Sequence, residues 1–230
     1  RAGDDEDARV RRVAIDIASR FQSPEGLSIL VHALDDTVVD NVLVALAALR
    51  DHEDEIALRW WLRLFVHPEA RVRVAVADAF AQVYREEEAL IERKYLALPY
   101  LIHLLEDADA SVRAAAARAL ASAERFRGVH ALQAHLDDAD PEVRGEVIRS
   151  LGLIRQHSVV PRLLTLLDDP EQPARVTAQV FVALKRLGEG NVVQRLEAFS
   201  KAPQPSLEKR LALFTQLLTL QQDASVFETE

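Results

Sequence analysis

Hydrophobic residues recur along the chain at spacings of three and four, which is the periodicity of helices buried on one face. Leucines stand at 98, 101, 104 and 105, and apolar residues at 143, 147, 148 and 151. An acidic turn separates the two kinds of helix, and Asp140-Pro141 has the residue types of an N-cap and first helical position. With only seven glycines and almost no strand-like alternation, the pattern predicts an all-α protein built from helix pairs.

Three segments repeat one motif without gaps, in which leucines and an acidic turn precede an arginine. The arginines Arg113, Arg144 and Arg175 follow one another at a constant step of thirty-one positions, and the turn aspartates keep the same spacing at Asp107, Asp138 and Asp169. Extending this register over positions 11 to 206 keeps that step throughout, except for one longer step of forty between 73 and 113. Such a period is typical of a repeat protein in which each helix pair packs on its neighbours.

The register predicts one domain over residues 1–230, with a leading helix at 8–21 followed by six helix pairs. We expect the pairs at 24–50, 55–85, 87–126, 129–156, 159–187 and 191–221. The leading helix has no partner helix, and the chain begins with Arg rather than Met. We therefore expect that the sequence was excerpted or processed from a longer chain.

The motif L-x-x-L-L-x-D, a short turn and V-R-x-x-A-x-x-A-L resembles the HEAT-like repeats, in particular the short bacterial type. The match is clearest over 101–120, 132–151 and 163–184. The resemblance implies a right-handed α-solenoid of stacked antiparallel helix pairs, whose second helices line the concave surface. It also implies a ladder in which turn aspartates and second-helix arginines link neighbouring repeats. The implied ladder residues are Asp107, Arg113, Asp138, Arg144, Asp169 and Arg175, with Arg11, Asp36 and Arg73 as further members.

The sequence departs from the ladder pattern at both halves of the chain. Val42 stands at an arginine position, His67 at an aspartate position, and Ser200 and Ser206 at the two positions of the last repeat. We expect a ladder that is incomplete in the first half and absent at the C-terminal end.

The two terminal helices differ in their apolar faces. In the leading helix, one face holds the apolar residues Val10, Val13, Ala14, Ile17 and Phe21. This one-sided pattern predicts a cap that packs its apolar face inward. The last helix has two opposite stripes, and the second contains Leu213, Leu217 and Leu220. We expect that stripe to be an interface, unless residues 221–230 fold back over it.

A column five residues beyond the ladder position is the candidate partner surface. It contains Asp16, Ala47, Asp78, Arg118, Arg149, Val180 and Leu211. Arg118 and Arg149 can receive acidic side chains or phosphates, although an ordinary solvated face is the alternative. The segment 38–50 is apolar nearly all round, so Leu43, Val44 and Ala47 form an apolar patch on this surface or are buried under the leading helix.

Other candidate sites are weaker. Trp60-Trp61 is either core packing or a pair of interface aromatics. His52-Glu53 is a single His-Glu pair, whereas di-iron HEAT-repeat hydroxylases need several, so no metal site is expected. No nucleotide-binding or hydrolase motif occurs in the sequence, and we expect no cofactor.

Composition narrows the function further. Twenty-eight basic against 37 acidic residues give a net charge of −9, which disfavours nucleic acid as a partner. Cysteine is absent, which excludes thiol chemistry and disulfides. The longest uncharged stretch, 211–222, is too short to cross a bilayer, and the first residues do not have the pattern of a signal peptide. We expect a cytoplasmic protein from a GC-rich bacterium.

The leading hypothesis is a non-enzymatic scaffold that binds a partner protein, or another domain of the same polypeptide, on its concave face. A homo-oligomer formed through the C-terminal helix is also possible. Two alternatives follow from the resemblance: a phycobilin-lyase-like enzyme subunit, because such lyases contain short HEAT-like repeats, and a nucleic-acid-binding protein similar to the HEAT-like DNA glycosylases.

Overall fold

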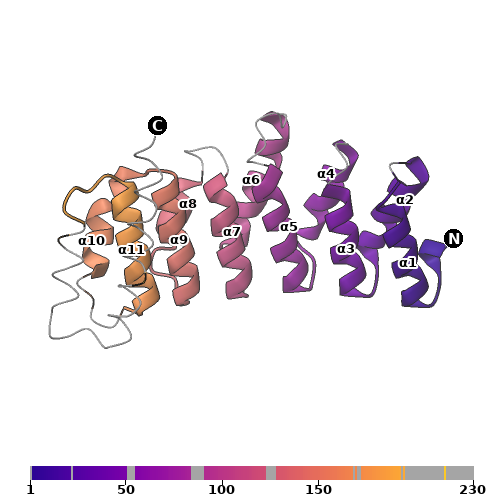
Figure 1. Cartoon of the computed structure of the whole chain (residues 1–230), viewed down its shortest axis with the longest axis horizontal. Helices are drawn as coiled ribbons and strands as arrows, with labels where there is room; N and C mark the ends of the chain where they lie inside the picture. Colours follow the sequence, from indigo (N-terminus) through magenta and orange to yellow (C-terminus); the bar gives the residue numbers. More distant parts are fainter. Residues whose placement is uncertain are drawn as a thin grey trace. The chain divides into compact units, whose positions relative to one another are not determined.

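The computed structural model describes residues 2–21, 23–50, 55–83, 91–122, 128–167, 169, 172–192, 194 and 215. All regular elements in these ranges are helices (Figure 1). They belong to two compact units, unit 1 at residues 1–123 and unit 2 at residues 124–230. The sixth predicted helix pair lies almost entirely outside the described residues, and so do Leu213, Leu217 and Leu220. The C-terminal stripe therefore stays a prediction.

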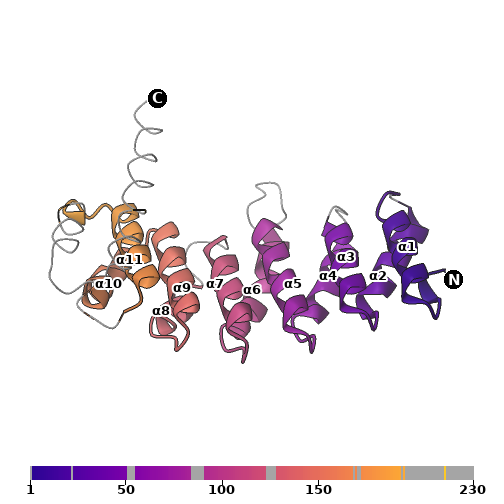
Figure 2. The same ribbon diagram turned by 60° about the horizontal axis from the view of Figure 1, so that its bottom comes forward.

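Unit 1 contains two rows of helices. The second helices of the repeats are α1 (Ala8–Ala18), α3 (Val39–Arg50), α5 (Ala70–Val83) and α7 (Ala110–Ser122). They pack side by side in chain order, as Figures 1 and 2 show. The first helices are α2 (Pro24–His32), α4 (Glu55–Leu64) and α6 (Ile91–Leu104), and short 3-10 helices lie at η1 (Ala2–Asp4) and η2 (Ala33–Asp35).

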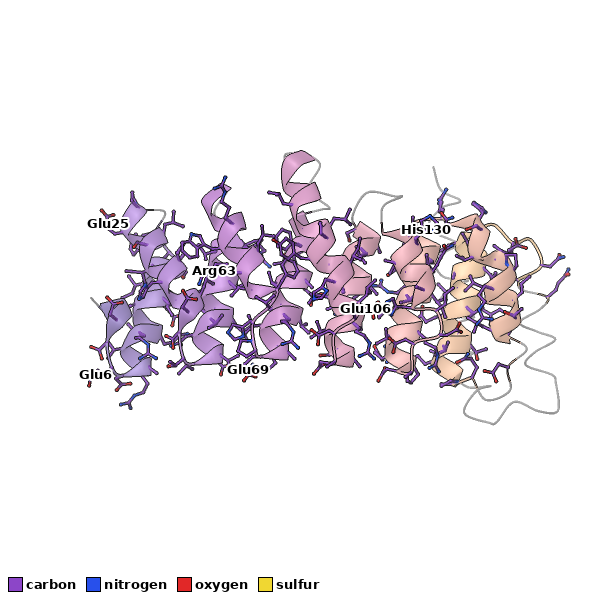
Figure 3. All side chains as sticks on the ribbon, turned by 180° about the vertical axis from the view of Figure 1, so that it is seen from behind. Glu6, Glu25, Arg63, Glu69, Glu106 and His130 are labelled. Atoms are coloured by element: carbon purple, nitrogen blue, oxygen red, sulfur yellow. The ribbon has the colours of Figure 1, made fainter. Side chains whose placement is uncertain are left out.

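The second helices of unit 1 run in the same direction. Figure 3 places Glu6 and Glu69, which precede α1 and α5, at the same edge of the unit. Between the two rows lies a core of fully buried side chains that includes Leu30, Leu49 and Phe80. At the start of α2, Ser23 accepts a hydrogen bond from the Gly26 amide at 3.0 Å, which satisfies one of the free amides of the first turn.

Unit 2 contains α8 (Val129–Ala134), α9 (Pro141–Leu153), η3 (His157–Val159), α10 (Val160–Leu167) and α11 (Ala174–Arg186). The second helices α9 and α11 pack along each other, while α8 packs on α9 and α10 on α11. A Cβ on Gly152 would lie 2.9 Å from the Cα of Ala183. Glycine is therefore what lets the two backbones approach at this point.

The repeat length changes in unit 2, which corrects the predicted register. Helix α11 begins at Ala174 and α9 at Pro141, a step of thirty-three positions instead of thirty-one. Leu132 and Leu163 are both fully buried and keep the shorter step, so the two additional residues lie between Leu163 and Ala174. The second-helix residue that corresponds to Arg144 is therefore Thr177, and Arg175 corresponds to Glu142.

The leading helix buries a different face from the one that the sequence predicted. Helix α1 buries Ala14, Ile15 and Ala18, whereas most of the predicted inward face is exposed. The exposed members of that face are Val10, Val13, Ile17 and Phe21. The prediction was wrong because α1 has two apolar sides, and the side with the smaller residues is the one that packs on α2 and α3.

Candidate interaction surfaces

Two bidentate ion pairs join neighbouring repeats in unit 1. Arg11 donates to both carboxylate oxygens of Asp36 at 2.8 Å, and Arg73 donates to those of Asp107 at 2.7 and 2.8 Å. The remaining guanidinium nitrogen of each arginine donates to two backbone carbonyls of the turn that precedes its own helix. Each arginine therefore fixes its own turn and holds the acidic turn of the next repeat.

The electrostatics of these pairs favour the charged carboxylates. Hydrogen bonds from Arg11 lower the pKa of Asp36 to about 2, against the opposing effect of burial, with help from the Val38 amide and Asn41. Burial acts to raise the pKa of Asp107, but hydrogen bonds from Arg73 and the Asp109 amide outweigh it and lower the pKa. Both lowered pKa values therefore belong to aspartates that link neighbouring repeats.

One rung of the ladder lacks both of its charged groups. Val42, at the arginine position, is completely buried. His67, at the aspartate position, accepts a hydrogen bond from the Glu69 amide through Nδ1 at 3.1 Å. In the same way, Asp107 accepts a hydrogen bond from the Asp109 amide at 2.9 Å. His67 thus keeps the turn-forming function of the aspartate without its charge.

The ladder continues in unit 2 with a neutral acceptor. Arg144 donates to the carbonyl of Asp138 at 2.7 Å and to Oε1 of Gln172 at 3.0 Å. Sequence reasoning missed Gln172, because a glutamine in a turn carries no recognisable ladder signal.

Two other residues that the sequence assigned to the ladder lie in different parts of the structure. Arg113 donates to the turn carbonyls of Asp107 and Ala108 in unit 1, and Asp169 is an exposed residue between α10 and α11.

Arg175 does not occupy the ladder position that the sequence register predicted. It lies in the first turn of α11, beside α9, and donates to Glu142 at 2.6 Å. The two residues hold corresponding positions on adjacent second helices, so this is a lateral ion pair. Because both side chains are exposed, it contributes little to stability.

The column of candidate partner residues is largely neutralised within the protein. In unit 1, Nη2 of Arg118 lies 3.4 Å from Oδ1 of Asp78. In unit 2, Arg149 donates to Glu146, one turn earlier on α9, at 3.0 Å. Val180 is completely buried because of the longer repeat step, and Leu211 lies outside the described residues. The two arginines therefore offer less free positive charge to a phosphate than their sequence positions indicate.

An apolar strip runs across α3 and α5 on this surface. Leu43 and Val44 of α3 are half-buried and Ala47 is exposed, while Val74 and Ala75 of α5 are half-buried. We call these five residues the α3–α5 strip. Val74 and Ala75 stand one repeat step after Leu43 and Val44. The repeat register could therefore have identified these two residues as part of the same strip, although the sequence prediction did not include them. The strip lies on two helices that pack on each other.

The tryptophan pair divides between the core and the surface. Trp61 is buried and meets Phe80 edge to face at 5.6 Å, and Phe65 stacks on Phe80 at 5.3 Å and on Tyr100 at 5.4 Å between ring centroids. Trp60 is half-buried, with the Arg63 guanidinium 4.9 Å above its ring.

Neither a metal-binding cluster nor a membrane-spanning helix occurs in the described residues. No group of three or more His, Asp or Glu residues in those ranges is arranged to hold a metal ion, and His52-Glu53 lies outside them. None of the helices in the described part of the chain has the length and apolar character needed to cross a membrane.

Stacked helix pairs joined by such rungs define an α-solenoid, which confirms the predicted fold class. Residues 128–215 match the family described as HEAT repeats and residues 97–122 match the HEAT repeat. The chain contains HEAT repeats, as the sequence motif predicted.

Two engineered proteins of known structure share this fold. One from the Northeast Structural Genomics Consortium is 22% identical, with 79% of this chain and 90% of that chain covered and a TM-score of 0.53. A second from the same consortium is 20% identical, with 95% and 66% covered and a TM-score of 0.50. Human deoxyhypusine hydroxylase in complex with glycerol is 16% identical, with 94% and 92% covered and a TM-score of 0.42. No curated protein matches the chain.

Proposed function

We propose that this protein is a non-enzymatic scaffold that binds a partner protein, or another domain of its own polypeptide, through the α3–α5 strip. The observation that carries the proposal is the strip itself, in which five apolar side chains of two adjacent helices remain accessible. Helix surfaces that face only water normally carry polar residues. Accessible apolar residues surrounded by polar ones are the usual core of a protein interface.

The charges beside the strip support an apolar partner. On one side Arg12 pairs with Asp16 at 3.1 Å, and on the other Asp78 pairs with Arg118. Both pairs are neutral as units, so neither of them offers a net counter-charge to a phosphate or to a strongly charged peptide. We infer that the partner presents an apolar segment, such as one face of an amphipathic helix, between these two pairs.

The distribution of perturbed acid–base groups supports a role without catalysis. In the described residues, the clearest pKa shifts fall on Asp and Arg side chains of the repeat joins and helix starts, including Asp36, Asp107 and Asp7. Catalytic groups are usually perturbed in a cleft that also holds a nucleophile or a metal. Here Asp36 and Asp107 bind arginines across the repeat joins, and Asp7 binds Arg9 at the start of α1.

A site-specific photocrosslinking experiment tests the proposal. A photoreactive amino acid at Ala47 should form a covalent adduct with one discrete polypeptide in cells of the source organism. The matched control is Val66, which is 73% exposed and lies outside the strip. Leu43→Asp should abolish the Ala47 adduct, and Val66→Asp should leave it intact. Identical adducts from both positions, or an Ala47 adduct that survives Leu43→Asp, would overturn the proposal.

A further inference from the structure

The turn before α5 contains a side chain of a kind that changes charge near neutral pH. His67 uses its Nδ1 atom to accept a hydrogen bond from the Glu69 amide at 3.1 Å. The corresponding turn before α7 uses a carboxylate, because Asp107 accepts the Asp109 amide at 2.9 Å. The turn before α5 therefore depends on the lone pair of an imidazole nitrogen, and that lone pair is also where a proton binds.

The geometry determines which form of the ring can make this bond. An imidazole nitrogen accepts a hydrogen bond only while it carries no proton, so the neutral ring bears its proton on Nε2. A second proton binds at Nδ1 and converts the acceptor into a donor that faces the N–H of Glu69. Histidines as a class change charge between about pH 5 and 8, whereas carboxylates do so in stronger acid. Mild acid should therefore break this bond of His67 and leave the carboxylate turns intact.

Several ion pairs from the packed elements surround the turn. Arg73 of α5 donates to the carbonyls of His67 and Pro68 at 2.7 and 2.9 Å, and its other nitrogens bind Asp107. On the side of α3, the uncharged Val42 holds the register position opposite His67. Other charged groups at this end of the two joints are Glu69, Asp109 and the pairs Asp36–Arg11, Asp40–Arg71 and Asp35–Arg63. The aspartates of these pairs bind arginines, so the bond from the Glu69 amide is the polar contact of the His67 ring that proton uptake alters directly.

The turn is connected to the α3–α5 strip through Arg73. This arginine binds two carbonyls of the turn, and Val74 and Ala75 of the strip are the next two residues of α5. In the neighbouring rungs, an arginine of the preceding repeat also holds the turn. Because Val42 stands at that arginine position here, the hydrogen bonds within the turn contribute a larger share of its stability.

The joint between α3 and α5 is packed less closely than the joint between α5 and α7. Ala75 of α5 is half-buried, whereas Ala115, at the same register position of α7, is completely buried. An element with fewer buried apolar contacts opens at a lower cost in free energy. A change in the turn before α5 is therefore able to alter the spacing of α3 and α5.

We propose that His67 is a pH-sensitive switch within unit 1. Proton uptake at Nδ1 breaks the hydrogen bond from the Glu69 amide, loosens the turn before α5 and lets α5 move relative to α3. The α3–α5 strip consists of residues from both helices, so mild acid should weaken its binding to a partner. This last consequence rests on the function proposed above, whereas the loosening of the turn does not.

Hydrogen exchange of the 230-residue chain tests the switch without a partner. After correction for the intrinsic pH dependence of exchange, the opening equilibrium of residues 65–73 should rise about 3–10-fold from about pH 7.5 to about pH 5.5, as expected for the loss of one hydrogen bond. In His67→Asn, the amide oxygen accepts the Glu69 amide and does not titrate, so the opening should not change. A wild type without a response, or an equal response of the two proteins, would overturn the proposal.

A second histidine of unit 1 provides the matched control. Nε2 of His32 lies 3.0 Å from Oδ1 of Asp4, in contact with η1 and away from α5. His32→Asn should respond to pH at residues 65–73 as the wild type does. If this variant loses the response, the sensitivity belongs to His32 and the assignment to His67 is wrong.

Nitrogen NMR of histidine-labelled protein tests the protonation site independently of the exchange experiment. The signals of His67 are those that disappear in His67→Asn. At neutral pH they should show a ring with its proton on Nε2 and a free Nδ1, and acid should add the second proton at Nδ1. A neutral ring that carries its proton on Nδ1 would contradict the proposal.

The consequence for the partner is measured by photocrosslinking from Ala47 in extracts at the same two pH values. The adduct of the wild type should decrease at least ~2-fold in mild acid, and the adduct of His67→Asn should not. If no discrete adduct forms at either pH, the proposed function fails and the exchange experiment still decides on the switch. An adduct that decreases equally in both proteins would leave the proposed function intact and refute its regulation by His67.

Discussion

Val42 and His67 occupy the two halves of the same rung, and both have lost their charge. They stand 25 residues apart, which is also the separation of Arg11 and Asp36 in their ion pair. A lone arginine at the buried position 42 would be an unpaired charge, and a lone aspartate at 67 would lack its strongest donor. The loss of one partner therefore makes the loss of the other less costly.

Restoring this rung should be cooperative. Val42→Arg alone should destabilise the protein by about 3 kcal/mol, because it buries an unpaired charge. His67→Asp alone should change stability by less than about 0.5 kcal/mol, because aspartate also accepts the Glu69 amide. The double variant should recover about 1–3 kcal/mol relative to the sum of the single changes. Urea unfolding of the four proteins gives this coupling energy directly, and simple additivity would contradict the rung assignment.

Acid should weaken the joint between the first two repeats. Because Asp36 has a pKa of about 2 in the folded protein, against an ordinary value of 3.8, its stabilising effect is full above about pH 4. It is lost as the pH falls from about 4 to 2, and amounts to at most about 2 kcal/mol. Asp36→Asn should lower the stability at neutral pH and flatten this part of the profile. Denaturant midpoints measured from strong acid to neutrality are the readout, and an unchanged slope in the variant would be incompatible with the assignment.

The C-terminal ends of α9 and α11 provide a matched pair of substitutions. Arg155 and Gly188 both have a left-handed backbone, with φ of 57° and 76°, and they are related by the same longer step that separates the two helix starts. Arg155→Gly should stabilise the protein by about 1 kcal/mol, because glycine adopts this conformation without strain. Gly188→Ala should cost a similar amount. Thermal unfolding of both variants measures these effects, and the same sign for the two changes would refute the explanation.

Two glycines of α9 should respond in opposite directions. A Cβ on Gly152 meets the backbone of Ala183 at 2.9 Å, whereas a Cβ on Gly145 has its nearest neighbour, Cγ of Gln179, at 3.8 Å. Gly152→Ala should therefore cost about 1–3 kcal/mol, because the helices must separate. Gly145→Ala should be neutral or stabilise by up to about 1 kcal/mol through helix propensity. Denaturant unfolding distinguishes the two, and equal effects would mean that α9 and α11 are less tightly packed than described.

The sequence predicted the helices well because their signals are local. The expected segment 38–50 is Val39–Arg50 in the structure, and the second helix expected to begin at Pro141 does begin there. Leucine spacing, capping residues and acidic turns determine these boundaries within a few residues.

The errors arose where the outcome depends on contacts between helices. A gapless alignment through Leu163 hid two additional residues, so Arg175 was assigned to a rung and Gln172 was overlooked. In α1, periodicity identified two apolar sides, but it carries no information on which side meets α3. For the same reason, the sequence predicted the α3 residues of the α3–α5 strip but not its α5 residues. Whether Val74 is accessible depends on the side chains that pack around it.

At Gln172 a carboxamide replaces the carboxylate of the Asp36 and Asp107 joints. The joints between repeats therefore differ in their sensitivity to pH. An amide acceptor does not titrate, and its bond to Arg144 holds equally well in strong acid and in neutral solution. The Arg11–Asp36 joint loses its partner when the carboxylate takes up a proton. A brief exposure to acid should therefore loosen the N-terminal repeats selectively, so that a protease active at low pH would cut first near η2 and leave the α9–α11 segment as a resistant fragment.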